Sequence, residues 1–148
     1  MVVTWQKVAI EDLRRYPALR QSLTAIREKQ AALDLQAGVV RSSFRDAAPV
    51  SGSGTSGAED KLISNIVERE RLDGYYAAVQ KLEAQIETAL DLLDKTERLV
   101  LERFYMHRMD GHVDRLCREL GYERSHVYNI KEKALRSFTI AMYGLLDL

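Results

Sequence analysis

The 148-residue sequence has few of the residues that interrupt helices or cross-link secreted domains. It contains two prolines and eight glycines, and from residue 58 onward the only glycines are Gly74, Gly111, Gly121 and Gly144. Because strand-and-turn folds need turn residues at short intervals, an all-β fold is disfavoured. The single cysteine, Cys117, excludes an internal disulfide and is typical of a reducing compartment.

Long apolar runs and an excess of one charge are also missing. No stretch approaches the roughly 18–20 apolar residues of a membrane span, and no basic start precedes an apolar signal core. We therefore expect a cytoplasmic protein with no membrane partner. Basic and acidic side chains number 22 each, so no overall charge draws the chain to nucleic acid. The balance shifts along the chain, from 12 basic and 14 acidic residues over 1–94 to 10 and 8 over 95–148.

Helical periodicity fills most of the chain. Residues 4–16 are predicted to form a short amphipathic helix, and Pro17 suits the first turn of a new helix, where its missing N–H costs nothing. From there to about residue 43, apolar or small side chains recur at alternating steps of four and three. The positions are Leu19, Leu23, Ile26, Leu33, Ala37, Val40 and Phe44, with one polar interruption at Gln30. Such a heptad seam indicates a helix packed along its length against a partner.

A stretch rich in glycine and serine then breaks the pattern. Residues 45–58 contain three of each and a proline, and are predicted to be a flexible linker. The stretch lacks the Lys-Ser or Lys-Thr that a phosphate-cradling loop needs after its last glycine. A helix predicted over 59–94 would fold back antiparallel on the helix over 17–43, as a coiled-coil-like hairpin. In the alternative interpretation, part of the seam forms a dimer.

The last third of the chain has a more specific pattern. After a helix predicted over 96–105, a short helix over 112–120 would stop at Gly121. Ser125 would then cap a further helix over 125–138. Two helices joined by a short glycine-containing turn form the helix-turn-helix pattern. We expect a shared core built from Val113, Leu116, Leu120, Val127, Ile130, Leu135 and Phe138.

The second helix of this pair has the side chains that a DNA reader needs. Residues in the first turns of a recognition helix reach base edges in the major groove. Arg can bond guanine and Asn can bond adenine, each with two hydrogen bonds, while Lys and Arg can meet phosphates. The candidate DNA-binding residues are Arg124, Ser125, His126, Tyr128, Asn129, Lys131, Lys133 and Arg136. Any one of them, His126 above all, is compatible with a solvated helix face, but the set favours DNA binding.

The segment from Thr96 to Arg136 resembles the fourth conserved region of bacterial sigma factors, which reads the −35 promoter element. The similar features are the Thr-Glu-Arg-Leu-Val-Leu opening, the Leu-Gly before the turn and the Lys-Ala-Leu-Arg of the recognition helix. More narrowly, the whole chain resembles small phage regulators of the ArpU and RinA type. The matching features are Glu-Asp-Leu-Arg-Arg-Tyr-Pro near the start, Pro-Val-Ser-Gly-Ser-Gly before a Glu-Asp pair, and the Arg-Phe-Tyr, Val-Tyr and Met-Tyr-Gly elements of the C-terminal third.

The resemblance implies a transcriptional regulator of phage or prophage late genes that works with host RNA polymerase. It assigns base contacts to Arg124, Ser125, Tyr128 and Asn129. It places His126, Lys133 and Arg136 where the sigma family contacts the DNA backbone or packs. At Cys117 such motifs have a small residue because the two helices cross closely there, which implies an inert packing thiol.

Metal binding and catalysis find little support in the sequence. His107, His112 and Cys117 are spaced five residues apart, so on a helix successive side chains turn by about 500° and point in different directions. No Cys-x-x-Cys or His-Glu-x-x-His motif accompanies them, and no Ser/His/Asp or paired-carboxylate arrangement stands out. We therefore expect no metal, no cofactor and no enzyme activity.

Together these patterns predict an all-α fold with two domains. Residues 1–94, with the linker at 45–58, would form a long antiparallel helical hairpin, and residues 95–148 a helix-turn-helix bundle that binds double-stranded DNA. Because a hairpin leaves much apolar surface open, we expect a homodimer. Two alternatives remain: a DNA-packaging component like the small terminase subunits, and a coiled-coil scaffold that binds no DNA.

Overall fold

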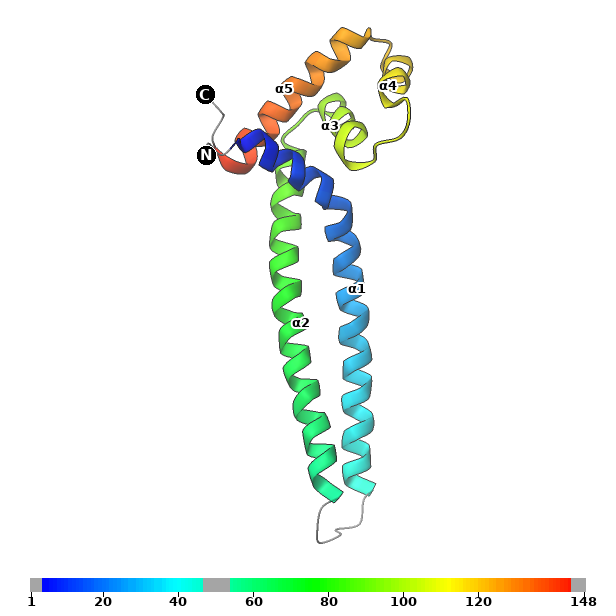
Figure 1. Ribbon diagram of the computed structural model, residues 1–148, viewed down its shortest axis with the longest axis vertical. Coiled ribbons are helices and arrows are strands. Elements are labelled where there is room, and N and C mark those ends of the chain that lie inside the picture. Colours follow the sequence, from blue (N-terminus) through cyan, green and yellow to red (C-terminus); the bar gives the residue numbers. More distant parts are fainter. Residues whose placement is uncertain (1–3, 47–53, 145–148) are drawn as a thin grey trace. The chain divides into compact units, whose positions relative to one another are not determined.

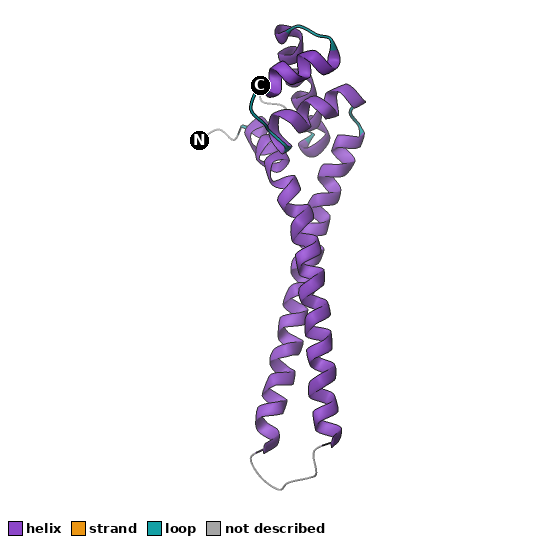
Figure 2. Cartoon of the chain, turned by 90° about the vertical axis from the view of Figure 1, so that its right-hand side faces the viewer, coloured by secondary structure: helices purple, strands orange, loops and turns teal. Residues whose placement is uncertain are grey.

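The computed structural model describes residues 4–46 and 54–144, and within them all regular secondary structure is helical. The predicted all-α class is therefore confirmed (Figures 1 and 2). The elements are α1 (Trp5–Asp46), α2 (Gly54–Asp91), α3 (Lys95–Leu101), the π-helical turn η1 (Glu102–Met106), α4 (His112–Leu120) and α5 (Arg124–Tyr143).

The chain divides into two compact units, and their boundary differs from the predicted one. The first, which we name the core unit, contains the residues up to Arg20 together with those from Lys81 onward. The second, the two-helix unit, runs from Gln21 to Gln80. The predicted division was after residue 94, whereas in this one the first turns of α1 and the last turns of α2 belong with α5, because they share a core with it.

The N-terminal region is one helix and not the two that were predicted. Pro17 lies inside α1, where it removes one helical hydrogen bond at a typical cost of about 3 kcal/mol. Leu13 and Tyr16 before it are buried, and Leu19 after it packs on the same core. Burial of side chains on both sides of the proline offsets its cost, which a local rule for proline does not anticipate.

The second long helix also has different ends from those predicted. It begins at Gly54, inside the predicted 45–58 linker, and α1 extends to Asp46 at the other end of that stretch. Residues 47–53 of the predicted linker lie outside the described residues. The helix ends at Asp91 because Asp94 is the N-cap of α3. The Asp94 side chain accepts the Glu97 N–H at 2.7 Å, and the Asp94 backbone is extended.

Within the two-helix unit, α1 and α2 run side by side in opposite directions (Figure 1). Polar contacts join them: Gln30 Nε2 donates to Asp73 Oδ1 at 2.6 Å, and Asn65 Nδ2 donates to the Leu33 carbonyl at 2.9 Å. The guanidinium of Arg27 lies 3.7 Å from the centre of the Tyr76 ring, a cation–π contact. Only three described side chains of this unit are buried, namely Ala37, Asn65 and Leu72.

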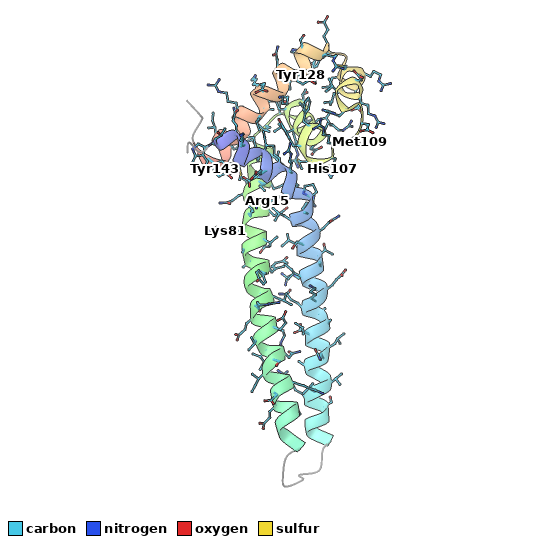
Figure 3. The ribbon with its side chains drawn as sticks, viewed as in Figure 1. Arg15, Lys81, His107, Met109, Tyr128 and Tyr143 are labelled. Carbon is cyan, nitrogen blue, oxygen red and sulfur yellow. The ribbon has the colours of Figure 1, made fainter. Side chains whose placement is uncertain are left out.

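The core unit has a much larger interior. Its main cluster draws on α1, α2, α3 and α5, and consists of Ala9, Leu13, Tyr16, Ile86, Ala89, Leu90, Leu101, Ala134, Leu135 and Phe138. Two tyrosines tie its elements together: Tyr16 donates to Glu87, and Tyr143 donates to the buried Asp12 (Figure 3 labels Tyr143). Burial and the neighbouring carboxylate raise the pKa of both tyrosines above the usual value.

The π-helical turn lets one short segment serve two clusters. Phe104 is buried in a second, smaller cluster, while Met106 packs against the main one and Tyr105 touches both. The His107 N–H closes the turn on the Glu102 carbonyl, five residues back, at 2.7 Å. An insertion of this kind changes which side chains face each direction. The predicted helix over 96–105 is thus an α-helix followed by this turn.

Candidate nucleic-acid interface

The turn between α4 and α5 is set by a glycine. Gly121 has a φ of 72°, a left-handed conformation that favours glycine, and its N–H donates to the Cys117 carbonyl at 2.9 Å. Helix α4 therefore ends at Leu120, and α5 begins at Arg124 after a three-residue turn. The predicted short helix over 112–120 and its stop at Gly121 are confirmed.

A small core fixes this helix pair on the end of α3 and on η1. It contains Val100, Phe104, Val113, Leu116 and Val127, with Leu120, Ile130 and the half-buried Cys117 packed around it. Part of the predicted core is wrong, because Leu135 and Phe138 belong to the main cluster. Helix α5 is long enough to serve both cores: its first turns pack on α4, and later turns pack on α1, α2 and α3.

The predicted start of the recognition helix is wrong by one residue. The N-cap is Glu123, whose backbone is extended and whose carbonyl accepts the Val127 N–H at 3.0 Å. The Glu123 side chain forms no capping hydrogen bond, and Ser125 is a residue of the exposed first turn and not the cap. The helix also continues beyond the predicted residue 138, to Tyr143, and Gly144 with a φ of 67° follows it.

Seven of the eight candidate residues lie exposed on α5 (Tyr128 is labelled in Figure 3). They are Arg124, Ser125, His126, Tyr128, Asn129, Lys133 and Arg136. At 100° per residue, all of these except Arg124 fall within about half of the helix circumference. The buried Val127, Ala134, Leu135 and Phe138 occupy the other side. The structure therefore brings most of the predicted set onto one continuous face.

Lys131 does not lie with the others. Its side chain is only 17% exposed, and its Nζ lies 2.6 Å from Glu132 Oε1. The same ammonium lies 5.7 Å from the ring centres of both Phe104 and Tyr128. These contacts hold Lys131 at the border between the exposed face and the small core.

Arg124 begins α5 with a partner on α4. Its Nη1 lies 2.6 Å from Asp114 Oδ1, and both side chains are largely exposed. An exposed ion pair of this kind contributes about 0–1 kcal/mol, so a stronger acceptor can displace it. The pair joins the first turn of α4 to the first turn of α5 and limits the directions in which the guanidinium points.

Two aromatic contacts organise the rest of the face. The His126 ring meets Tyr122 edge-on, with ring centres 4.5 Å apart. Tyr128 meets Phe104 edge-on at 5.7 Å and stays exposed at its outer end. Edge-on pairs of this kind add about 0.5–1.5 kcal/mol beyond the area they bury. Both side chains are therefore held in place before any ligand arrives.

One member of this face, Glu132, was not predicted from the sequence. It is exposed and follows Ser125 and Tyr128 by seven and four residues, which puts it on the same side of α5. A carboxylate here repels phosphates but can accept a hydrogen bond from the amino group of cytosine. The Lys-Glu-Lys run at 131–133 was the available signal, and helical spacing alone would have found it.

Further ionisable groups surround the start of α4, and most of them are outside the candidate DNA-binding set. A groove next to the first turn of α5 is lined by Arg108 and Arg124, with Asp110 and Asp114 among them. His112, in the same groove, has its pKa lowered by burial and by the charge of Arg108. The two basic and two acidic side chains leave this groove close to neutral, so its local charge does not select phosphate.

The described residues limit what else this surface does. No group of three or more His, Cys, Asp and Glu side chains within residues 4–46 and 54–144 is arranged to hold a metal ion. None of the helices described is long and apolar enough to cross a membrane. The exposed donors of α5 can form hydrogen bonds and ion pairs with an elongated polyanion.

No family model, curated protein or solved structure matches this chain.

Proposed function

We propose that the chain is a sequence-specific DNA-binding transcriptional regulator. One observation carries the proposal: seven polar, basic or aromatic side chains lie exposed on a helix that follows a glycine-terminated nine-residue helix. The helix pair is held by its own small core, so it presents the face without help from a ligand. This is the arrangement in which a recognition helix enters the major groove of DNA.

The roles of the side chains follow from their chemistry and position. Arg124 and Asn129 would bond base edges, while Lys133 and Arg136 would meet phosphates. On binding DNA, Arg124 would give up its weak, exposed ion pair with Asp114 and form two hydrogen bonds with a guanine in the major groove. Glu132 would exclude phosphate from the middle of the face and favour a cytosine there.

The sigma-like and phage-like sequence features support a narrower version of this function. In it, the protein regulates phage or prophage late genes together with host RNA polymerase and its sigma factor. Replacing that sigma factor would need an aromatic, basic promoter-melting segment, and the acidic-leaning residues 1–94 offer none. A regulator of this kind is cytoplasmic, and at least a homodimer is needed to read paired half-sites.

Selection of bound DNA from a random pool tests the proposal. We expect enrichment of one short motif by the full chain and loss of that enrichment in the Asn129→Ala, Lys133→Ala double variant. Lys81→Ala is the matched control: it also removes an exposed positive charge, but it lies beside Ala141 and Met142 at the other end of α5. Recovery of no motif by the folded parent chain would contradict the proposal. It would leave a coiled-coil scaffold or a packaging component that binds DNA with little sequence preference.

A second function, a DNA-packaging component like the small terminase subunits, is favoured by a different observation. The two-helix unit exposes apolar side chains such as Leu35 and Val67 on both of its helices. Packaging subunits join a helix-turn-helix to helical oligomerisation elements and form large rings. A ring of eight or more copies that binds DNA with little sequence preference would favour this alternative.

A further inference from the structure

The two helices of the two-helix unit expose large apolar side chains on the sides that face away from each other. Leu35 and Val39 are 75% and 67% exposed, and each is two residues from the buried Ala37. On α2, Ile63 and Val67 are 58% and 57% exposed and lie two residues from Asn65. Two residues correspond to about 200° on a helix, so all four point away from the contact between α1 and α2.

Each of these surfaces continues along its helix with small side chains and a single charge. The α1 edge consists of five exposed residues, Glu28, Ala31, Ala32, Leu35 and Val39. The α2 edge consists of six exposed residues, Ile63, Ile66, Val67, Glu70, Ala77 and Ala78. A helix side in water is normally rich in charged residues, so the composition of both edges is typical of surfaces that pack on protein.

The unit itself buries too little to account for these edges. Three of its described side chains are buried, and one of them, Asn65, has an Oδ1 with no hydrogen-bond donor among the described residues. In contrast, five of the eleven large hydrophobic residues exposed in the described chain lie on these two edges. The apolar surface that would stabilise this pair of helices is thus on its outside.

A second copy of the chain fits this surface, provided that unlike edges meet. If α2 edges paired with each other antiparallel, so that Ile63 lay against Val67, Glu70 would lie opposite Asp60 of the other copy. Such a contact brings like charges together and is destabilised. The α1 edge has no acidic residue at that height, since its one carboxylate, Glu28, lies almost two turns from Leu35.

The heights of the two edges match. Gln30 lies level with Asp73, and Asp34 with Arg69, because their side chains meet across the unit. By the same register, Leu35 lies level with residue 68, next to Val67. Val39 lies level with residue 64, next to Ile63. When two copies lie side by side in the same direction, the large apolar groups of one α1 edge therefore meet those of the next α2 edge.

The charges beside the edges also complement each other. In the same register Lys29 lies level with Gly74, about one helical turn from Glu70, and both charged side chains are exposed. Glu28 lies level with Tyr75, one turn from Arg71, which forms an exposed ion pair with Glu68 on its own helix. Two acidic and two basic side chains thus meet at one end of the apolar contact.

We infer that the two-helix unit associates with further copies of itself, the α1 edge of one copy covering the α2 edge of the next. Because the two surfaces of this contact differ, a pair of bound copies still offers one uncovered α1 edge and one uncovered α2 edge. Association therefore continues beyond two copies until a ring closes. A symmetric homodimer, by comparison, would use one edge twice.

Two variants and their mixture test this inference by solution mass. Leu35→Glu, Val39→Glu blocks the α1 edge, and Ile63→Glu, Val67→Glu blocks the α2 edge. We expect the parent chain to exceed the mass of two copies and each variant alone to be monomeric. An equimolar mixture should form a dimer with one copy of each variant, because only one intact pair of edges remains.

A matched control variant adds the same number of charges beside the two edges without blocking either edge. Gln36→Glu, Ser64→Glu adds two acidic side chains to exposed positions that lie beside the edges, next to Leu33 and Asn65, and should keep the parent mass. A monomeric parent, an assembly that persists when one edge is blocked, or a mixture that stays monomeric would each overturn the inference. Helical content measured by circular dichroism confirms that every variant is folded.

Discussion

The core unit and the two-helix unit share two helices but bury very different numbers of side chains. Of the 20 buried residues in the described chain, 17 belong to the core unit and three to the two-helix unit. The same helices are thus held by a packed interior at one end and by isolated polar contacts at the other. We infer that the core unit folds as a stable body, whereas the two-helix unit depends on association to reach comparable stability.

The largest effect should come from truncating a side chain in the core unit. Phe138 is fully buried among residues of α1, α2 and α3, so Phe138→Ala should lower the free energy of unfolding by about 3–5 kcal/mol. Denaturant unfolding of the full chain measures this loss. Ile140→Ala, on the exposed side of the same helix, should change stability by less than about 0.5 kcal/mol. Equal effects of the two variants would mean that α5 does not pack as described.

A buried leucine in the two-helix unit should matter less, and only locally. Leu72→Ala removes one of its three buried side chains, at a cost of about 2 kcal/mol, because exposed neighbours can close the space left. Amide hydrogen exchange should speed up over residues 21–80 and stay unchanged over residues 81–144. Faster exchange across both ranges would show that the two units unfold as one.

The turn of the candidate interface should be sensitive to a single methyl group. Gly121→Ala should cost about 1–2 kcal/mol, because its φ of 72° is left-handed while nothing lies within 4 Å of an added Cβ. Gly38→Ala makes the same change inside α1, again with nothing within 4 Å, and should stabilise that helix by up to about 1 kcal/mol. Thermal unfolding of both variants checks these opposite signs; stabilisation by Gly121→Ala would refute the assigned turn.

A smaller effect is expected from pH, and only in the core unit. Burial and a carboxylate neighbour raise the pKa of Tyr16 and Tyr143, so the folded chain retains these protons where the unfolded chain loses them. Their contribution to stability is complete below about pH 10 and is lost as the pH rises through the folded pKa values. Unfolding measured from pH 9 to 12 should show this loss, and Tyr16→Phe, Tyr143→Phe should weaken it. An identical pH profile in the double variant would contradict this assignment.

Local signals in the sequence predicted the helix-turn-helix well. Gly121 marks the end of α4, and helical spacing placed Arg124, Ser125, Asn129 and Lys133 on an exposed helix without any knowledge of packing. These features depend on backbone conformation and on period, which are properties of a short segment.

Features that depend on distant residues were not predictable in this way. Pro17 stays within α1 because Leu13 and Tyr16 pack against residues more than 70 positions away. Phe138 and Leu135 were assigned to the wrong core. The helical pattern indicates that both are buried, but it does not indicate which other helices they pack against.

We propose that the exposed face of α5 reads DNA, and DNA binding measured over a range of salt concentrations is the sharpest test of that proposal. At the preferred site, Asn129→Ala should lose about 1–3 kcal/mol and tolerate more bases at one position. Lys133→Ala should instead weaken binding to all sequences alike and reduce the salt dependence by about one counterion. Both side chains are exposed, so both variants should stay folded. If the folded double variant bound DNA like the parent chain at every salt concentration, the assignment of α5 as the recognition helix would be wrong.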